Sequence, residues 1–149
     1  YEEVPLYAPA AILSAGSRPW GRPQAWIAAP EDSAPSLTLR WDSPVPVQEI
    51  RLFFDPDLAM ELPSSHARHW EKSHLFAPRH GMPPQLVKDF ALLGLLPDGT
   101  WKTLSAQKDQ HQRLAVIPLE HAQAFRALRL DIRGTWGNLP PVLYKISVY

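Results

Sequence analysis

A long apolar run over residues 86–107 is the strongest structural signal in the chain. Its first arm is apolar at both alternating positions, with Phe90 and Leu92 on one side and Leu93 on the other, as in a strand covered on both faces. An Asp-Gly turn at residues 97–100 ends this arm, and a shorter half-polar run follows. The pattern predicts a β-hairpin in the middle of a sheet.

Alternation of apolar and polar side chains marks the other expected strands. They are residues 25–28, 37–41, 47–54, 114–119, 128–133 and 142–148. Pro44 and Pro46 are expected to break the chain between two of them, and residues 121–125 to form a single helical turn. Many short strands with little helix predict an all-β fold, an antiparallel jelly-roll β-sandwich.

The chain is expected to form a single β-sandwich domain over residues 1–149, with an irregular leading segment at 1–35. Residues 55–85 form a long loop without a sustained period. Loops of this length in a compact domain are uncommon, and they are usually functional or disordered. The sequence begins at Tyr1 without an initiator methionine, which suggests a cut-out domain or a processed chain. A chain whose initiator methionine has been removed would begin in the same way.

If successive strands run alternately up and down, the connections sort to the two ends of the sandwich. The turns at 42–46, 97–100 and 120–125 fall at one end. The segments before residue 37 and at 55–85, 108–112 and 134–141 fall at the other, which we call the loop end. Binding residues often lie on loops that a rigid scaffold holds. The loop end is expected to gather Trp20, Trp26, Trp70, Trp136, Asp109, His111, Asn138 and the histidines of the long loop.

Charge and composition narrow the range of partners. The chain has 15 Lys and Arg residues and 15 Asp and Glu residues. Its formal net charge is therefore zero, and it lacks the basic charge expected of a nucleic-acid-binding protein. No apolar stretch approaches the roughly 20 residues of a membrane span, so membrane insertion is not expected. The absence of cysteine excludes disulfides and thiolate chemistry. It leaves the compartment of this soluble chain unknown, with a secreted or periplasmic location as options.

Several short motifs resemble a known family in their order along the chain. They read Ile-Arg-Leu-Phe-Phe-Asp at 50–55, Val-Lys-Asp-Phe at 87–90, Asp-Gly-Thr-Trp-Lys at 98–102, Gln-Arg at 112–113, Ala-Leu-Arg-Leu-Asp-Ile at 127–132, Thr-Trp-Gly at 135–137 and Tyr-Lys-Ile-Ser-Val-Tyr at 144–149. In this order residues 36–149 resemble a galactose-binding-like sandwich of the discoidin, or coagulation-factor type C, kind. The resemblance implies a mostly non-catalytic module that often binds glycans through its loop end.

A narrower resemblance involves residues 54–58, 79–83 and 135–137. These are similar to the C-terminal domain that follows the flavin domain in some bacterial FAD-dependent oxidoreductases. This likeness implies that the partner is an upstream catalytic domain of the same chain and that FAD is bound only there. No dinucleotide or phosphate-binding glycine motif occurs in the chain, so no FAD site is expected in this domain.

Tryptophans on loops can stack on sugar rings, while nearby polar groups bond the hydroxyls. The candidate ligand-binding residues are Trp20, Trp70, Trp136, Arg18, His69 and Asn138. The alternative is that each tryptophan covers the open end of the core, and this is favoured for Trp26 and Trp136. Trp41 and Trp101 lie on expected strands, so they are interpreted as core or sheet-surface residues.

Metal and catalytic sites have weaker support. The spacing of His66, His69, His74 and His80 matches no standard zinc pattern, so a solvated loop is expected. Calcium remains an alternative, with Asp55, Asp57 and Asp109 as weak candidate ligands that lack a fixed spacing. No catalytic residues are assigned, although His69 or His80 could be drawn as a base with Asp57 or Glu71.

Arg113 and Arg129 lie on or beside expected strands next to apolar neighbours. One interpretation is that one of them reaches a ligand. The favoured one is that they pair with Asp89, Asp109 or Asp131 across the sheet surface.

The sequence therefore favours an accessory module of a larger protein. Docking against an oxidoreductase domain is preferred, because residues 55–85 mix aliphatic with basic side chains. The alternative is a carbohydrate-binding module that uses the loop end. An independent enzyme ranks third.

Overall fold

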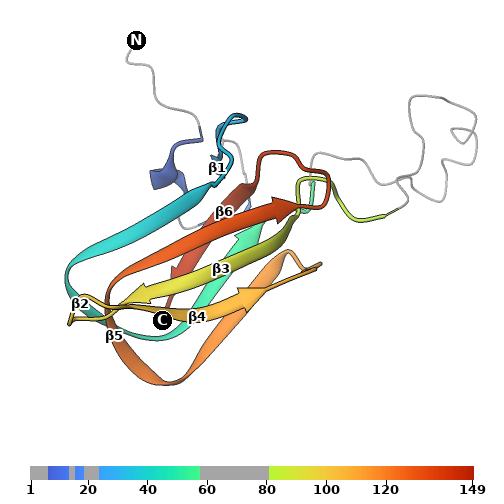
Figure 1. The fold of residues 1–149 in the computed structure, drawn as a ribbon. Helices are drawn as coiled ribbons and strands as arrows, with labels where there is room; N and C mark the ends of the chain where they lie inside the picture. Colours follow the sequence, from blue (N-terminus) through green and yellow to red (C-terminus); the bar gives the residue numbers. More distant parts are fainter. Residues whose placement is uncertain (1–6, 14–15, 19–23, 58–80) are drawn as a thin grey trace, which may run out of the picture.

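The structure is a computed structural model that describes residues 7–13, 16–18, 24–57 and 81–149 (Figure 1). Its elements are a 3-10 helix η1 (Pro9–Leu13) and the strands β1 (Trp26–Ile27), β2 (Ser36–Phe54), β3 (Val87–Leu95), β4 (Trp101–Gln107), β5 (Leu114–Thr135) and β6 (Val142–Val148). The strands form an antiparallel six-stranded sheet in the order β1-β6-β2-β5-β3-β4. The all-β prediction is confirmed.

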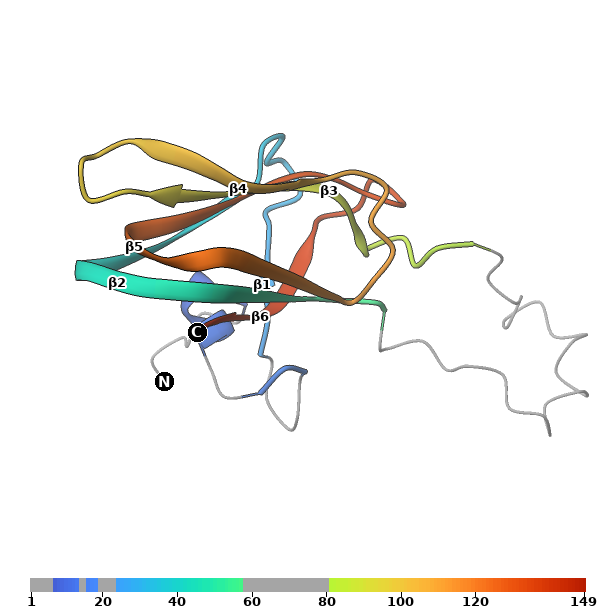
Figure 2. The same ribbon diagram turned by 90° about the horizontal axis from the view of Figure 1, so that it is seen from below.

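The long strands β2 and β5 turn this one sheet into a sandwich. They pair along most of their length and bend together, so each contributes to both layers (Figure 2). The front sheet consists of β4, β3, residues 127–135 of β5 and residues 36–40 of β2. The back sheet consists of β1, β6, residues 49–54 of β2 and residues 114–118 of β5. The core lies between these two sheets.

Two local predictions were wrong at the bends. The expected break at Pro44 and Pro46 is a continuous strand whose register shifts between Arg40 and Val45. Proline is tolerated where the ladder is irregular, because its missing N–H is not needed there. Residues 121–125 are strand rather than a helical turn, since they pair with β2 at Val45↔Phe125. Pairing between distant strands overrides the local preference.

Large apolar side chains from both sheets fill the core. Phe54 of the back sheet and Phe90 of the front sheet are buried, with ring centroids 5.4 Å apart and planes tilted by 52°. Ile12 of η1 is also buried in this cluster, so the short helix closes one side of the sandwich. Burying each such side chain contributes about 1.5 to 3 kcal/mol.

The strand β3 is covered on one face only, which corrects the expectation of a strand buried on both. Phe90 and Leu92 face the core. Leu93 and Leu95 lie on the opposite face and stay partly exposed, because no described element covers the outer surface of the front sheet. The apolar run therefore leaves aliphatic side chains on an outer surface.

The described parts of the long connections meet at one end of the sandwich, as their parity predicts (Figure 1). The Phe54 amide donates to the Arg113 carbonyl at 2.8 Å, and the Gly137 amide donates to the Pro84 carbonyl at 2.7 Å. The turn at Asp98 lies at the opposite end, where its carboxylate accepts the Thr100 amide at 2.9 Å. Among the described residues, no helix has the length and apolar character needed to cross a lipid bilayer.

Candidate functional site

Trp136 joins the loops of the loop end. Its indole nitrogen donates to the Gln110 carbonyl at 2.8 Å, and its backbone amide donates to the Leu86 carbonyl at 3.1 Å. The ring is half-buried and packs against the core. Hydrogen bonds and packing together therefore hold the indole in one position.

Lys88 lies over the Trp136 ring. Its ammonium nitrogen is 5.1 Å from the ring centroid and 3.2 Å from a carboxylate oxygen of Asp109. A cation over an indole is stabilised by the negative face of the ring. This face of Trp136 is therefore occupied by Lys88 rather than open for stacking.

The loop at residues 108–113 is fastened to the start of β3. The Asp109 amide donates to a carboxylate oxygen of Asp89 at 2.9 Å, and Asp109 has a positive φ of 52°. The Gln110 amide donates to the Lys88 carbonyl at 2.9 Å. The Gln110 side-chain amide donates to the Val87 carbonyl at 2.9 Å. These bonds fix the loop that carries Asp109 and His111.

The loop at residues 134–141 presents its tip to solvent. The Thr135 hydroxyl accepts the Leu139 amide at 2.9 Å and donates to the Leu139 carbonyl at 2.8 Å. Asn138 lies between them with a positive φ of 52°, a conformation that asparagine tolerates better than most residues. Its side chain is exposed and has no hydrogen-bond partner among the described residues. The loop therefore fixes the backbone of Asn138 at the surface, and its side-chain amide faces solvent.

A hollow of about 260 Å³ lies beside the loop at 108–113. It is lined by Phe90, Gln107, Lys108, Asp109, Gln110, His111, Gln112, Leu114, Ala115, Val116 and Ile117. Charged and amide side chains meet an apolar floor there. This mixture is typical of small-ligand sites, in which a few polar groups set orientation.

Comparison with known proteins identifies the architecture. No family model matches the chain, and no curated protein matches it in sequence. A chitosan-binding module from a chitosanase/glucanase of Paenibacillus sp. IK-5 is similar at a TM-score of 0.67 and 10% identity, over 97% of this chain and 86% of that one. The family 32 carbohydrate-binding module of Streptococcus pneumoniae EndoD is similar at a TM-score of 0.64 and 15% identity, over 96% and 85%.

The fold is galactose-binding-like. A GH29 fucosidase of Ruminococcus gnavus, solved in complex with fucose, contains a similar region at a TM-score of 0.62 and 10% identity. The match covers 97% of this chain and 22% of the fucosidase. At these identities the comparisons establish the fold, and the flavoenzyme host stays a prediction.

The galactose-binding-like sandwich brings only some of the candidate residues together. Trp136 and Asn138 share one loop at the loop end, with Asp109 and His111 on the neighbouring loop. Arg18 is exposed beside Ser17, whose carbonyl accepts a hydrogen bond from Arg113. Trp26 is buried in the core, as its favoured interpretation predicts. The predictions for Trp20, Trp70 and His69, and for the other histidines of the long loop, lie outside the described residues.

Asp55 and Asp57 form a buried polar cluster at this end of the sandwich. The Asp57 amide donates to a carboxylate oxygen of Asp55 at 2.7 Å, and the Gln85 side chain donates to Asp57 at 2.9 Å. Burial raises the pKa of Tyr144, and a hydrogen bond to Asp55 raises that pKa further. Among the described residues, no three His, Asp or Glu side chains lie close enough together to hold a metal ion. Calcium binding stays a prediction.

The two arginines behave differently from each other. Arg129 forms a bidentate pair with Asp131 at 2.7 and 2.8 Å, as predicted. The predicted pairing of Arg113 was wrong, because its guanidinium donates to the Ser17 carbonyl and lies 6.0 Å from the Phe53 ring centroid. A contact across 96 residues of sequence decides its position.

Sequence reasoning missed Lys88 and Gln110 as part of the site. Lys88 interrupts an otherwise apolar strand start, next to Asp89. These two adjacent polar residues at the start of an apolar strand were the signal in the sequence that could have pointed to Lys88. Gln110 lies in a polar run where nothing distinguishes it from its neighbours, so only its contacts reveal its role.

Proposed function

We propose that this domain is a non-catalytic carbohydrate-binding module that holds a glycan at its loop end. One observation carries the proposal: backbone and side-chain hydrogen bonds around Trp136 fix two polar loops side by side, and a hollow borders one of them, the loop at 108–113. A site ordered before binding loses less conformational entropy when a ligand arrives. The likeness to solved carbohydrate-binding modules supports the same conclusion.

The exposed groups of the loop end suit sugar hydroxyls. Asn138 supplies an amide donor and acceptor, His111 a ring nitrogen, and Lys88 and Asp109 a charged pair. Leu139 is 44% exposed next to Asn138 and offers apolar contact to the C–H groups of a sugar. Because Lys88 covers one face of Trp136, the proposed contact with the indole is along its edge rather than by face-to-face stacking.

A carbohydrate-binding role implies attachment to a catalytic domain. The similar region of the Ruminococcus gnavus fucosidase is a small part of a longer enzyme. By analogy, the partners of this domain are a glycan and a catalytic domain of the same chain. The proposal places no catalytic residue in this domain.

Docking against that catalytic domain is the second candidate function, and a patch on the back sheet favours it. Leu114 is 36% exposed and Val116 47%, and both also line the hollow beside the loop at 108–113. Exposed apolar side chains that lie together often mark an interface. In the full-length protein, Val116→Asp would then increase protease cleavage between the domains. Equal cleavage of the variant and the wild type would refute docking through this patch.

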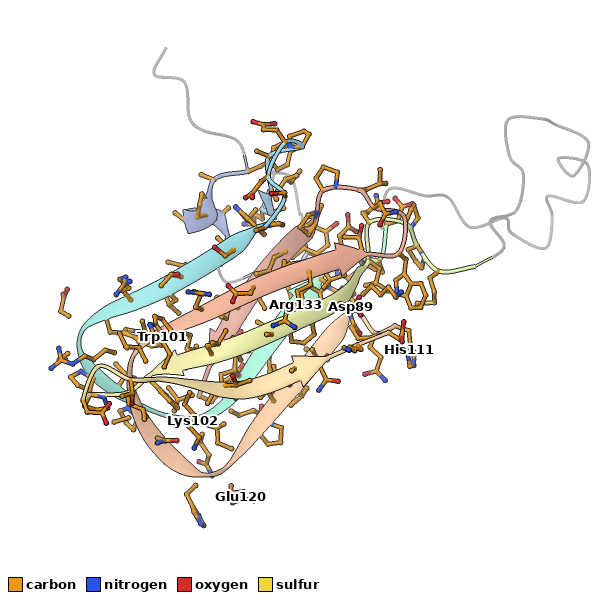
Figure 3. The ribbon with its side chains drawn as sticks, viewed as in Figure 1. Asp89, Trp101, Lys102, His111, Glu120 and Arg133 are labelled. Atoms are coloured by element: carbon orange, nitrogen blue, oxygen red, sulfur yellow. The ribbon has the colours of Figure 1, made fainter. Side chains whose placement is uncertain are left out.

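A glycan array tests the binding function. The domain is screened with and without calcium, together with Asn138→Ala, His111→Ala and Lys88→Gln. Glu120→Gln serves as the matched control, because Glu120 lies at the opposite end of the sandwich (Figure 3). We expect binding that Glu120→Gln preserves and that the loop-end variants weaken by tenfold or so, on the order of one lost hydrogen bond to a polar partner.

The result that overturns the proposal is equally specific. If the folded wild-type domain binds no glycan on the array, with or without calcium, the proposed loop-end site is refuted. Binding that none of the loop-end variants alters would refute it as well.

A further inference from the structure

The outer face of the front sheet carries a tryptophan that the loop-end site does not use. Trp101 begins the edge strand β4 and is 39% exposed. Figure 3 shows it at one end of this face, with Arg133 and Asp89 toward the loop end. A flat apolar ring at an exposed position offers a stacking surface for a sugar ring.

Strand register extends this surface across the sheet. Leu95 lies opposite Trp101 on one side and opposite Ala127 on the other. Ala127 in turn lies opposite Arg40. The row therefore passes from an exposed aromatic ring over a half-buried leucine and a fully buried alanine to an exposed cation.

Arg129 holds the next position on this face. Its guanidinium carbon is 5.7 Å from the Trp101 ring centroid, and it pairs with Asp131 at 2.7 and 2.8 Å. Its side chain is still 43% exposed. The bidentate pair fixes the orientation of the guanidinium and leaves part of it accessible to a ligand.

Arg40, Arg129 and Arg133 outnumber the carboxylates of Asp89 and Asp131 on this face. Arg40 and Arg133 are exposed, and neither forms an ion pair with a residue that the structure describes. Arg133 is six residues from Ala127, the neighbour of Arg40, which corresponds to roughly 20 Å along an extended strand. Arg40 ends the row that starts at Trp101, and Arg133 lies further along the strands toward the loop end. Cations spaced in this way around an aromatic ring are complementary to a chain that repeats carboxylates and sugar rings.

We propose that the outer face of the front sheet binds an acidic polysaccharide of the uronate class. A pyranose ring lies on Leu95 and on the face of Trp101 that Arg129 does not cover, and carboxylates of the chain meet Arg40, Arg129 and Arg133. This site is separate from the loop end and does not depend on the function proposed for it.

Polygalacturonate and its fully methyl-esterified form make a matched pair of probes, because esterification removes the charge of each carboxylate and adds only a methyl group. Affinity electrophoresis and calorimetry with both polymers are expected to show binding of the acid form and at least tenfold weaker binding of the ester. Trp101→Ala should weaken binding of the acid form at least tenfold, and Trp101→Phe should retain most of it. Arg40→Gln and Arg133→Gln should each weaken it several-fold and reduce its salt dependence.

Loop-end variants separate this proposal from the previous one. Asn138→Ala and His111→Ala should leave polygalacturonate binding unchanged, even if they abolish binding of neutral glycans. Thermal unfolding of every variant checks that the fold is intact.

Three outcomes would overturn the sheet-face site: no binding of polygalacturonate by the wild type, equal binding by folded Trp101→Ala, or loss of binding in the loop-end variants.

Discussion

The indole nitrogen of Trp136 donates a hydrogen bond to the backbone carbonyl of Gln110, with 2.8 Å between the two atoms. The bond joins residues 26 positions apart and closes the loop end of the sandwich. Lys88 lies on the same ring and pairs with Asp109 of the Gln110 loop. Trp136 therefore orders the polar side chains around it, and the geometry of the proposed glycan site depends on this residue.

Replacing Trp136 with phenylalanine should separate the hydrogen bond from most of the packing. The Gln110 carbonyl then loses its donor, and we expect the free energy of unfolding to fall by about 1 to 3 kcal/mol. Urea denaturation measures this change. Trp101→Phe is the control, because its exposed ring should change the free energy by no more than about 0.5 kcal/mol. Equal effects of the two substitutions would contradict the role of Trp136.

Gly137→Ala tests the contact between the loops at 134–141 and 81–86. A Cβ on Gly137 would lie 2.3 Å from the Cβ of Pro84 and 2.9 Å from its Cα. Backbone must move to relieve this overlap, so we expect a loss of about 1 to 3 kcal/mol and weaker glycan binding. Urea denaturation and calorimetry measure the two effects. Gly99→Ala at the opposite end should also lower stability, because the φ of Gly99 is 89°, but it should leave glycan affinity unchanged.

Gly94→Ala tests the packing under the bend of β5. The new Cβ would lie 2.4 Å from Cε1 of the buried Phe125 ring, so overpacking should cost about 1 to 3 kcal/mol. Phe125→Leu removes the ring and should reduce the added cost of the alanine. A double-mutant cycle from thermal or urea unfolding measures this coupling. Additive effects of the two substitutions would show that the two sites do not touch.

Tyr144 should make stability depend on pH in the alkaline range. Burial, together with the hydrogen bond to Asp55, raises the pKa of Tyr144 above its ordinary value. The folded state then holds this proton more tightly than the unfolded chain does. The resulting stability is fully present below the unfolded pKa of about 10 and is lost as pH rises from there toward the folded pKa.

Tyr144→Phe provides the comparison for this pH dependence. Its free energy of unfolding, measured in urea at pH 8 to 11.5, should fall less steeply above pH of about 10 than that of the wild type. The stability difference between the two proteins should therefore shrink in that range. Parallel curves would show that the folded state does not retain the Tyr144 proton.

Much of the fold follows from the sequence because strand signals are local. The alternation of Leu128, Leu130 and Ile132 with polar residues identifies a strand without knowledge of its partners. The Asp98-Gly99 turn locates the hairpin for the same reason. Alternating strand directions then place Asp109, Trp136 and Asn138 at one end, as the structure shows.

Tertiary structure alone decided the features that depend on contacts between distant residues. Whether the chain turns or continues at Pro46 depends on its pairing with Ala124. Whether Trp136 stacks on a ligand or clamps a loop depends on Lys88 and Gln110. Trp101 is exposed because no element among the described residues covers the outer face of the front sheet. A period of two residues reveals that a strand has two faces, and only the packing of the strands determines what each face meets.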